Sequence, residues 1–369
     1  MPSVTFEDEY IYARGKILQA INDNKIYWMT LLNRSGVGYG DGVTPRLLRA
    51  VMNLPLVLQA DGFDAAQESV LETFRTALAD AARGKTEGEV ILALLGWDAT
   101  LPINIKHKII KQAAAIKLFR HCYRIQQAGA RIVWVVSQPA SYTQFTVDEI
   151  LANGNSRILL EQKLSDTNEF FDATERANLL QATIRTRRWC DHALTCLWRA
   201  RAENADERAR VVKWFADPTV PKAIVDMMIT TLQRGYTQLR NRIDENRLIY
   251  VDKPTKRTDV GTVAFVHPTE AMRSIYIHRA FFAAPPPELR QQTYQAVTIL
   301  HELSHRVLKT DDHKYDHERL GVRASFHIGQ AIDNADTWAY FAADCAGEIN
   351  GGQGDWLRIG TPCAAHHHP

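Results

Sequence analysis

The chain alternates between segments in which apolar residues recur with a helical period and short segments with the pattern of strands. Apolar residues at roughly 3.6-residue spacing predict helices over residues 65–83 and 105–127. Two apolar runs, 90–95 and 131–136, are typical of buried strands, and the second is rich in β-branched residues. Residues 1–160 are therefore expected to be mainly helical.

The pattern changes in the second half of the chain. Helical spacing continues over 172–215 and 221–241, and the period then becomes two. Short segments rich in β-branched and aromatic residues are expected to be strands: 247–251, 262–267 and 274–278. After three prolines at 285–287, a last helix is expected to run to about residue 308. Several helices with a small sheet predict an α+β fold.

The length of the chain and its polar turn clusters indicate how it divides. A chain of 369 residues suggests two domains, because domains usually have about 100–200 residues. A polar cluster at 152–156 is a candidate boundary, and 165–168 is a second one. We expect a mainly helical N-terminal domain of unknown role over 1–160, an α+β domain over 165–350, and a C-terminal tail over 351–369.

Composition and charge exclude several classes of protein. Apolar residues make up 46% and charged residues 23%, as in ordinary globular proteins. A net charge of +2 gives no argument for nucleic acid or an anionic membrane, and no apolar run is long enough for a membrane span. Five cysteines without a CxxC pair argue against a disulfide scaffold and a cysteine-based zinc site. The acidic N-terminus lacks the apolar core of a Sec signal peptide, so we expect synthesis in the cytoplasm and, for any export, a specialised secretion system.

The strongest chemical signal is the HExxH sequence at residues 301–305. His301 and His305 are four residues apart, so they lie on one face of a helix and can bind one zinc ion. Glu302 points aside from the metal but can reach a water bound there. The alternative is that both histidines are hydrogen-bonded core residues without a ligand.

A catalytic zinc ion needs a third protein ligand and an open fourth position. The metzincin pattern requires Gly and His where this chain has Leu308 and Asp311, so that class is excluded. A gluzincin takes a glutamate from a second helix. Glu318 and Glu348 are candidates for that role, but neither has a matching surround.

The residues after the helix fit another pattern. Thr310, Asp312 and Tyr315 match the signature GTxDxxYG at the right mutual spacing, and Lys309 and Asp316 replace its two glycines. The chain here resembles the aspzincins, the family of deuterolysin and lysine-specific metallo-endopeptidases.

A third block strengthens this resemblance. Residues 334–341 read NADTWAYF, which is similar to the NADxYEYF block of the aspzincins. The resemblance covers about residues 172–349 and implies a zincin-like metallopeptidase domain within 165–350. Residues 1–160 resemble no family that we recognise.

The resemblance implies a role for each matched residue. Asp312 would be the third zinc ligand beside His301 and His305, and the ion would acidify its bound water toward a pKa of about 7. Glu302 would accept the proton of that water and return a proton to the leaving amine. Tyr315 would stabilise the oxyanion. Ordinary packing is the alternative for Tyr315.

Other residues near the motif could compete for these roles. Asp311 would be the ligand if the turn after the helix differs from the expected one. His313 and His317 are expected to lie at the surface or behind the ligands. The histidines at 366–368 are expected to belong to a tail.

Asp336 has two interpretations that the sequence leaves open. In lysine-cleaving aspzincins this aspartate and a glutamate form an acidic pocket for the substrate lysine. Here Ala339 stands in place of that glutamate, so strict lysine specificity is not expected. Asp336 could instead accept a hydrogen bond from a zinc-binding histidine and orient it.

These residues lead to one principal hypothesis and two others. The principal hypothesis is a zinc-dependent endopeptidase, with one catalytic Zn²⁺, that acts on polypeptides held along a sheet edge, for which 274–278 is our candidate strand. The alternative is a zincin-like module that binds metal without cleaving peptides. A further hypothesis is an exported bacterial toxin or effector, in which residues 1–160 contact secretion machinery or an immunity protein.

Overall fold

The computed structural model of the chain describes most of its residues. The described segments are 5–33, 43–57, 65–126, 132–137, 157–252, 262–267, 269–283, 285–286 and 289–360. The polar cluster predicted at 152–156 and the histidines at 366–368 lie outside them. Within the described segments, no helix combines the length and the apolar character that crossing a membrane would require.

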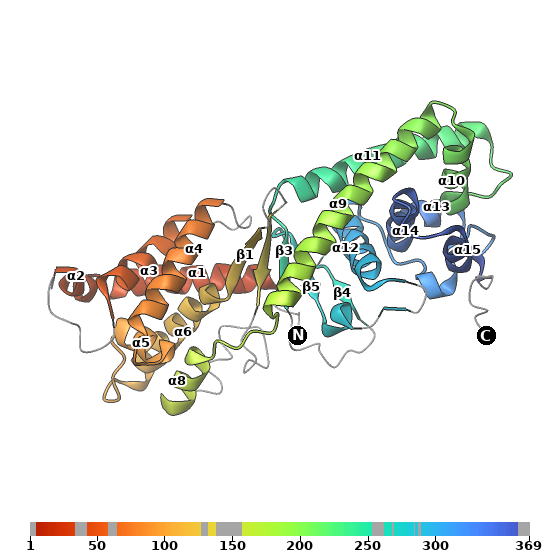
Figure 1. Cartoon of the computed structure of the whole chain (residues 1–369). Coiled ribbons are helices and arrows are strands. Elements are labelled where there is room, and N and C mark those ends of the chain that lie inside the picture. The colour runs from red at the N-terminus through yellow and green to blue at the C-terminus, as the bar shows by residue number, and fades with distance from the viewer. Residues whose placement is uncertain are drawn as a thin grey trace.

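Helices make up most of the described chain (Figure 1). Those before residue 170 are α1 (Phe6–Asp23), α2 (Lys25–Asn33), α3 (Pro45–Val57), α4 (Ala65–Ala81), α5 (Glu87–Leu94), α6 (Ile103–Arg120) and α8 (Arg157–Ser165). Those that follow are α9 (Ala173–Arg201), α10 (Ala205–Phe215), α11 (Lys222–Asp244), α12 (Gln291–Leu308), α13 (Ile328–Asp333), α14 (Ala335–Cys345) and α15 (Gly351–Ile359). Two short 3-10 helices, η2 (Arg279–Phe282) and η3 (Asp316–Glu318), lie on either side of α12 in the chain.

One mixed sheet joins the two halves of the chain. Its strands are β1 (Cys122–Gln126), β2 (Ile132–Val136), β3 (Ile249–Asp252), β4 (Ala264–Phe265) and β5 (Ser274–Ile277), in the order β1-β2-β3-β5-β4. β2, β3 and β5 are parallel, and the outer strands β1 and β4 are antiparallel to their neighbours. The fold is therefore α+β, as predicted. Because the sheet combines strands from both sides of the proposed boundary, the division into two domains stays a prediction.

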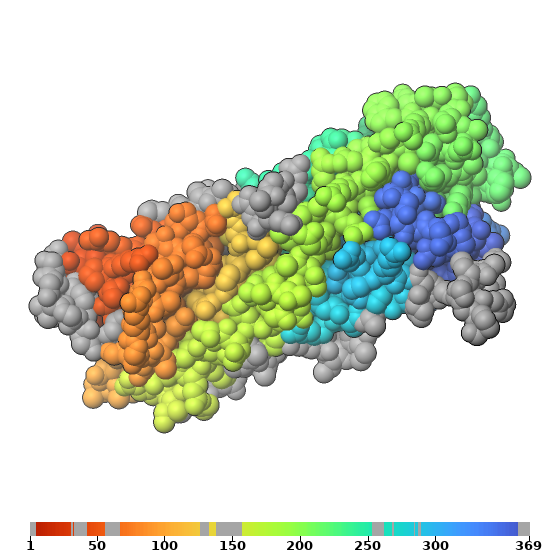
Figure 2. Space-filling model, viewed as in Figure 1, coloured from red at the N-terminus to blue at the C-terminus, as the bar shows by residue number. Residues whose placement is uncertain are grey.

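The two faces of this sheet belong to different hydrophobic cores. Along β2, Val133 and Val135 pack with helices of the C-terminal half, whereas Trp134 and Val136 pack with helices of the N-terminal half. This alternation follows from the two-residue period of a strand. The N-terminal helices lie on one side of the sheet and α9, α11 and α12 on the other (Figure 1), and the molecule is elongated (Figure 2).

Most predicted elements are confirmed, and three predictions need correction. Residues 90–95 lie in helix α5 and the turn after it, not in a strand, because Thr86 and Glu89 form a capping box that starts a helix there. The helix predicted over 105–127 ends at Arg120, and β1 follows it. The proposed edge strand at 274–278 is β5, which lies inside the sheet, whereas β4 lies at the edge.

A glycine sets the distance between α11 and α14, which carries residues of the site described below. Gly235 lies on the face of α11 against Trp338, and a Cβ at Gly235 would overlap the six-membered ring of that indole. The ring cannot move easily, because Trp338 Nε1 donates a hydrogen bond to the Ile332 carbonyl (2.6 Å).

We predict that Gly235→Ala destabilises the protein by about 1–2 kcal/mol, because the cost of overpacking exceeds the gain in helix propensity. Gly15 of α1 is the matched control, since it is exposed and a Cβ added there would meet nothing within 4 Å. Gly15→Ala should stabilise by roughly 0.5–1 kcal/mol. Urea unfolding of both variants measures these changes, and equal effects would contradict the packing argument.

Candidate metal centre

The two histidines of the HExxH sequence project from the last turns of α12 toward one point. His301 is buried, and His305 lies one turn later on the same face. Their Nε2 atoms are 3.0 Å apart. Leu300 and Leu303 are fully buried on the other side of α12, so packing of the helix fixes the direction of the histidines.

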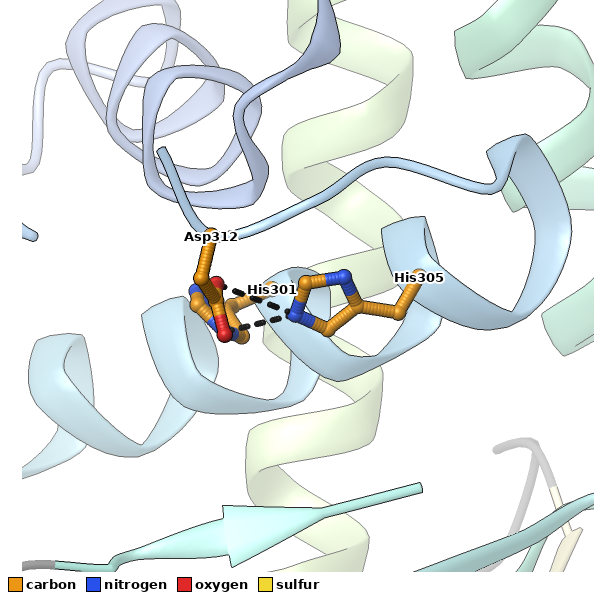
Figure 3. Close-up of side chains that lie close together, drawn as sticks. All are labelled: His301, His305 and Asp312. Atoms are coloured by element: carbon orange, nitrogen blue, oxygen red, sulfur yellow. Dashed lines mark hydrogen bonds and ion pairs between the residues drawn. The ribbon is translucent and has the colours of Figure 1, made fainter. Parts of the chain in front are cut away.

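The turn after α12 brings a carboxylate back over the same point. Lys309 ends the helix in the left-handed region, with φ of 63°. The chain then reverses, and Asp312 Oδ1 lies 3.2 Å from both Nε2 atoms. Figure 3 shows the three side chains converging, two from the helix and one from the loop above it.

Each imidazole is oriented by an acceptor at its other nitrogen. His301 Nδ1 lies 2.7 Å from Asp336 Oδ1, and His305 Nδ1 lies 2.7 Å from the Thr310 carbonyl oxygen. A carboxylate and a carbonyl only accept, so both Nδ1 atoms carry the proton. The Nε2 lone pairs of the neutral rings then face each other and the Asp312 carboxylate. Three acceptors this close require a cation or added protons between them.

The donor set fits a catalytic zinc ion. Within the described residues, His301, His305 and Asp312 form a group whose ligand atoms lie close enough to hold a metal. Ligand atoms about 2.0–2.1 Å from a tetrahedral zinc are roughly 3.3–3.4 Å apart, close to the spacing found here. Two imidazoles and one carboxylate leave a fourth position for solvent or substrate.

The loop that carries Asp312 is held by the start of α14. Asn334 is fully buried, and its side-chain oxygen accepts a hydrogen bond from the Lys314 backbone (2.8 Å). The Asp311 backbone pairs with residues on either side of Asn334, receiving from Ala335 and donating to the Asp333 carbonyl. The second oxygen of Asp336 accepts from the Asp316 backbone (2.8 Å). The NADTWAYF block therefore positions both a histidine and the loop.

A cleft of about 740 Å³ opens in front of the three ligand atoms. Glu302 borders it, with its carboxylate 3.9 Å from His301 Nε2. The Tyr315 side chain is 42% exposed, and its hydroxyl donates to Asp312 Oδ2 (3.1 Å). The edge strand β4 forms the opposite wall. Every described residue of the cleft lies between 262 and 340.

The charges of the site shift the pKa values of its groups. Burial lowers the pKa of His301, but the carboxylates of Asp312 and Asp336 outweigh it and hold that pKa well above its ordinary value. The pKa of His305 is raised in the same way, mainly by Asp312. Despite partial burial, the two histidines lower the pKa of Asp312. Burial raises the pKa of Glu302.

The side chains of the competing candidates make other contacts. The Asp311 carboxylate accepts from the Asp312 backbone, and His313 pairs with Asp333 Oδ2 at 2.9 Å. The His317 side chain is largely exposed. Glu318 caps the backbone of Tyr315, and Glu348 forms an ion pair with Arg185. None of these residues belongs to the group of ligand atoms found in the described chain.

Sequence reasoning assigned no role to Thr310, Asn334 or Asp316. Thr310 orients His305 through its carbonyl, which no side-chain pattern reveals. Asn334 is the first residue of the third motif, so its place there was a signal for a structural role. Asp316 replaces a glycine of the second motif, and its carboxylate accepts from the Tyr340 hydroxyl (2.7 Å).

Comparison with known proteins shows what the region around this site is similar to. The family model described as lysine-specific metallo-endopeptidase (Aspzincin_M35) matches residues 200–343. The match supports the resemblance of the C-terminal half of the chain to the aspzincin family. A curated relative, a peptidyl-Lys metalloendopeptidase of Pleurotus ostreatus, is 38% identical over 87 residues, which are 23% of this chain and 49% of the relative. The chain thus matches about half the length of this curated relative.

We predict that zinc binding to this site strengthens as the pH rises. The raised pKa values of His301 and His305 mean that the metal-free site holds protons that zinc must displace. Affinity should increase by at least about tenfold per unit between about pH 6 and 8. The protons stabilise the metal-free fold at low pH, and this stabilisation is lost as pH rises through the histidine pKa values. Calorimetric titration with zinc at several pH values measures the affinity. A zinc affinity that does not change with pH would contradict the assignment of His301 and His305 as ligands.

We also predict that Asp336→Asn weakens zinc binding by about 10–100-fold, because the orienting carboxylate of His301 is lost. Asp333→Asn is the matched control. Its side chain is half exposed and contacts His313 rather than a ligand, so zinc affinity should not change. Equal zinc affinity in both variants would show that Asp336 does not orient His301.

Proposed function

We propose that the chain is a zinc-dependent endopeptidase that hydrolyses peptide bonds in polypeptides. The observation that carries the proposal is the convergence of His301, His305 and Asp312 in an open cleft beside the buried Glu302. The match of the aspzincin family model to residues 200–343 supports it. We also propose that these residues belong to a zincin-like domain.

His301, His305 and Asp312 would hold the ion through two Nε2 atoms and one carboxylate oxygen. When bound, zinc supplies a Lewis acid that polarises a carbonyl and acidifies water. Glu302 is placed to take the proton of the attacking water and to return a proton to the leaving amine. Its raised pKa suits this role, because a base works best when its pKa approaches the working pH.

Tyr315 is proposed to stabilise the oxyanion. Burial and the nearby Asp312 carboxylate raise its pKa to about 12, so the phenol stays protonated and can donate. The hydroxyl now donates to Asp312 Oδ2, 3.1 Å away, at the border of the cleft. A donor fixed at this place can stabilise negative charge that develops on the substrate carbonyl.

The polypeptide is proposed to lie along β4 as an added strand. β4 has a hydrogen-bonded neighbour, β5, on one side and forms the wall of the cleft on the other. An extended peptide gains main-chain hydrogen bonds when it adds to such an edge. Thus β4 replaces β5 as the strand to which substrate would bind.

The cleft supports a preference for basic side chains without a strict requirement for lysine. Both oxygens of Asp336 are engaged, by His301 and by the Asp316 backbone, which favours the orienting role over the pocket role. Ala339 is fully buried and offers no charge. Asp316 also lines the cleft with a side chain that is 20% exposed, although its oxygens accept from the His317 backbone and the Tyr340 hydroxyl. The curated relative is named for peptidyl-lysine.

The N-terminal helices are proposed to serve recognition rather than chemistry. The described helices α1–α6 contribute no residue to the cleft. The role of an exported toxin or effector, whose residues 1–160 contact secretion machinery or an immunity protein, stays our hypothesis for these helices. We expect the unmodified chain to be toxic to cells that express it. The Glu302→Ala variant, which keeps the N-terminal segment, should not be toxic.

We predict that Glu302→Ala lowers the rate of peptide hydrolysis by at least about 10²–10⁴-fold, the usual contribution of a general base. One zinc ion per chain should remain bound, because Glu302 is not a ligand. Turnover of unfolded casein and zinc content by mass spectrometry test both points. His305→Ala is the control and should lose zinc as well as activity.

Two outcomes would reject this function. Full activity in Glu302→Ala would exclude the proposed base. One tightly bound zinc ion in the unmodified protein, without cleavage of any unfolded polypeptide, would favour the alternative of a metal-binding module that lacks peptidase activity.

A further inference from the structure

A second cavity, of about 250 Å³, adjoins the metal cleft. Its wall contains five cationic side chains and one carboxylate: Arg242, Arg247, Arg273, Arg306, Lys309 and Glu270. These residues come from the ends of α11 and α12 and from segments that precede β3 and β5. The cavity is therefore built where several elements end together, and its lining is strongly basic.

The cationic side chains of this cavity differ in their partners among the described residues. Arg242 and Arg273 share one partner, Glu245. Arg306 donates to the backbone carbonyls of His267, Glu270 and Met272, which bring no formal charge.

Glu7 accepts hydrogen bonds from the backbone of Ala271 and Met272, next to the cavity.

Lys309 connects this cavity to the metal cleft, because its side chain lines both. Its ammonium group has no hydrogen-bond or ion-pair partner among the described residues. Its φ of 63° is a conformation that glycine adopts at most helix ends of this kind, and that costs energy for lysine. A side chain kept at such a position is a candidate for function.

The direction of the bound peptide follows from the strand beside it. β4 runs from Ala264 to Phe265, and the cavity lies beyond its C-terminal end, where Arg306 holds the His267 carbonyl. Antiparallel pairing is the more stable choice for an added strand. A peptide that pairs in this way with β4 places the residues before its scissile bond toward the cavity.

We propose that this basic cavity binds an acidic side chain of the substrate, on the N-terminal side of the scissile bond, with Lys309 as the principal contact. The inference rests on the proposed peptidase function and adds a substrate class to it. Carboxylates such as Asp316 and Asp336 line the metal cleft, and the cations line the cavity that adjoins it at Lys309. Charge complementarity of this kind selects partners and sets their register.

The test compares fluorogenic peptides that differ only by Glu or Gln at one position before the scissile bond, with the zinc-loaded enzyme. We expect Glu at one of these positions to raise kcat/KM about tenfold through a lower KM, because the exposed Lys309 acts together with partly buried arginines around it. The preference should shrink as salt is added. No preference for Glu, or a preference only after the scissile bond, would overturn the proposal.

Two variants that each lose one positive charge distinguish an effect of the cavity from an effect of the protein's net charge. Lys309→Asn should reduce the preference for Glu to less than about twofold, because asparagine tolerates the left-handed conformation but lacks the charge. Lys222→Asn is the control, since Lys222 is exposed at the far end of α11. It should keep the full preference. An unchanged preference in Lys309→Asn would exclude Lys309 as the contact.

A binding measurement makes the outcome independent of turnover. Fluorescence anisotropy with zinc-loaded Glu302→Ala protein should show the Glu peptide binding about tenfold more tightly than the Gln peptide. If the unmodified enzyme cleaves neither peptide, the proposed function fails. The anisotropy measurement then still shows whether the cavity binds an acidic side chain. If Lys309→Asn does not fold, Arg242→Gln replaces it, with a partial loss of the preference expected.

Discussion

The structure around the site depends on holding three mutually repelling acceptor atoms close together. The Nε2 atoms of His301 and His305 and one oxygen of Asp312 lie 3.0–3.2 Å apart, and both Nδ1 atoms are already used as donors. Neutral imidazoles and a carboxylate repel at this distance unless a cation or added protons lie between them. The remaining structure around α12 holds the three atoms in this arrangement.

That support comes from distant parts of the chain. Asp336 and Asn334, at the start of α14, fix one histidine and the loop of Asp312, and Gly235 lets α14 approach α11 closely. Arg306, one residue past the second histidine, ties α12 to the connection between β4 and β5. The backbone of Phe6, in the first turn of α1, donates to the Tyr276 hydroxyl on β5. The N-terminal helices are thus attached to the sheet that carries the cleft wall.

The parts that sequence predicted well depend on local rules. Two histidines four residues apart on a helix must share a face, and long periodic segments such as α9 and α11 were predicted because their pattern is repeated many times. Matched motifs also predicted Asp312 beside them. The position of its carboxylate, however, depends on a left-handed residue and on hydrogen bonds to Asn334, which is 22 residues away.

The predictions that failed needed information from beyond the local pattern. The apolar run at 90–95 has the composition of a strand, but a capping box at Thr86 decides for a helix. Strand order is set by long-range pairing, so the sequence could not show that β4 lies at the edge and β5 inside. The basic cavity next to Lys309 is lined by residues from four separate segments, so no linear sequence motif could predict it.

The most direct test of the three-ligand site is an anomalous diffraction map at the zinc edge from crystals of the zinc-loaded protein. We predict one strong peak within about 2.0–2.2 Å of Nε2 of His301, Nε2 of His305 and an oxygen of Asp312. A zinc peak that lies elsewhere, with the Asp312 carboxylate turned toward bulk solvent, would contradict this assignment.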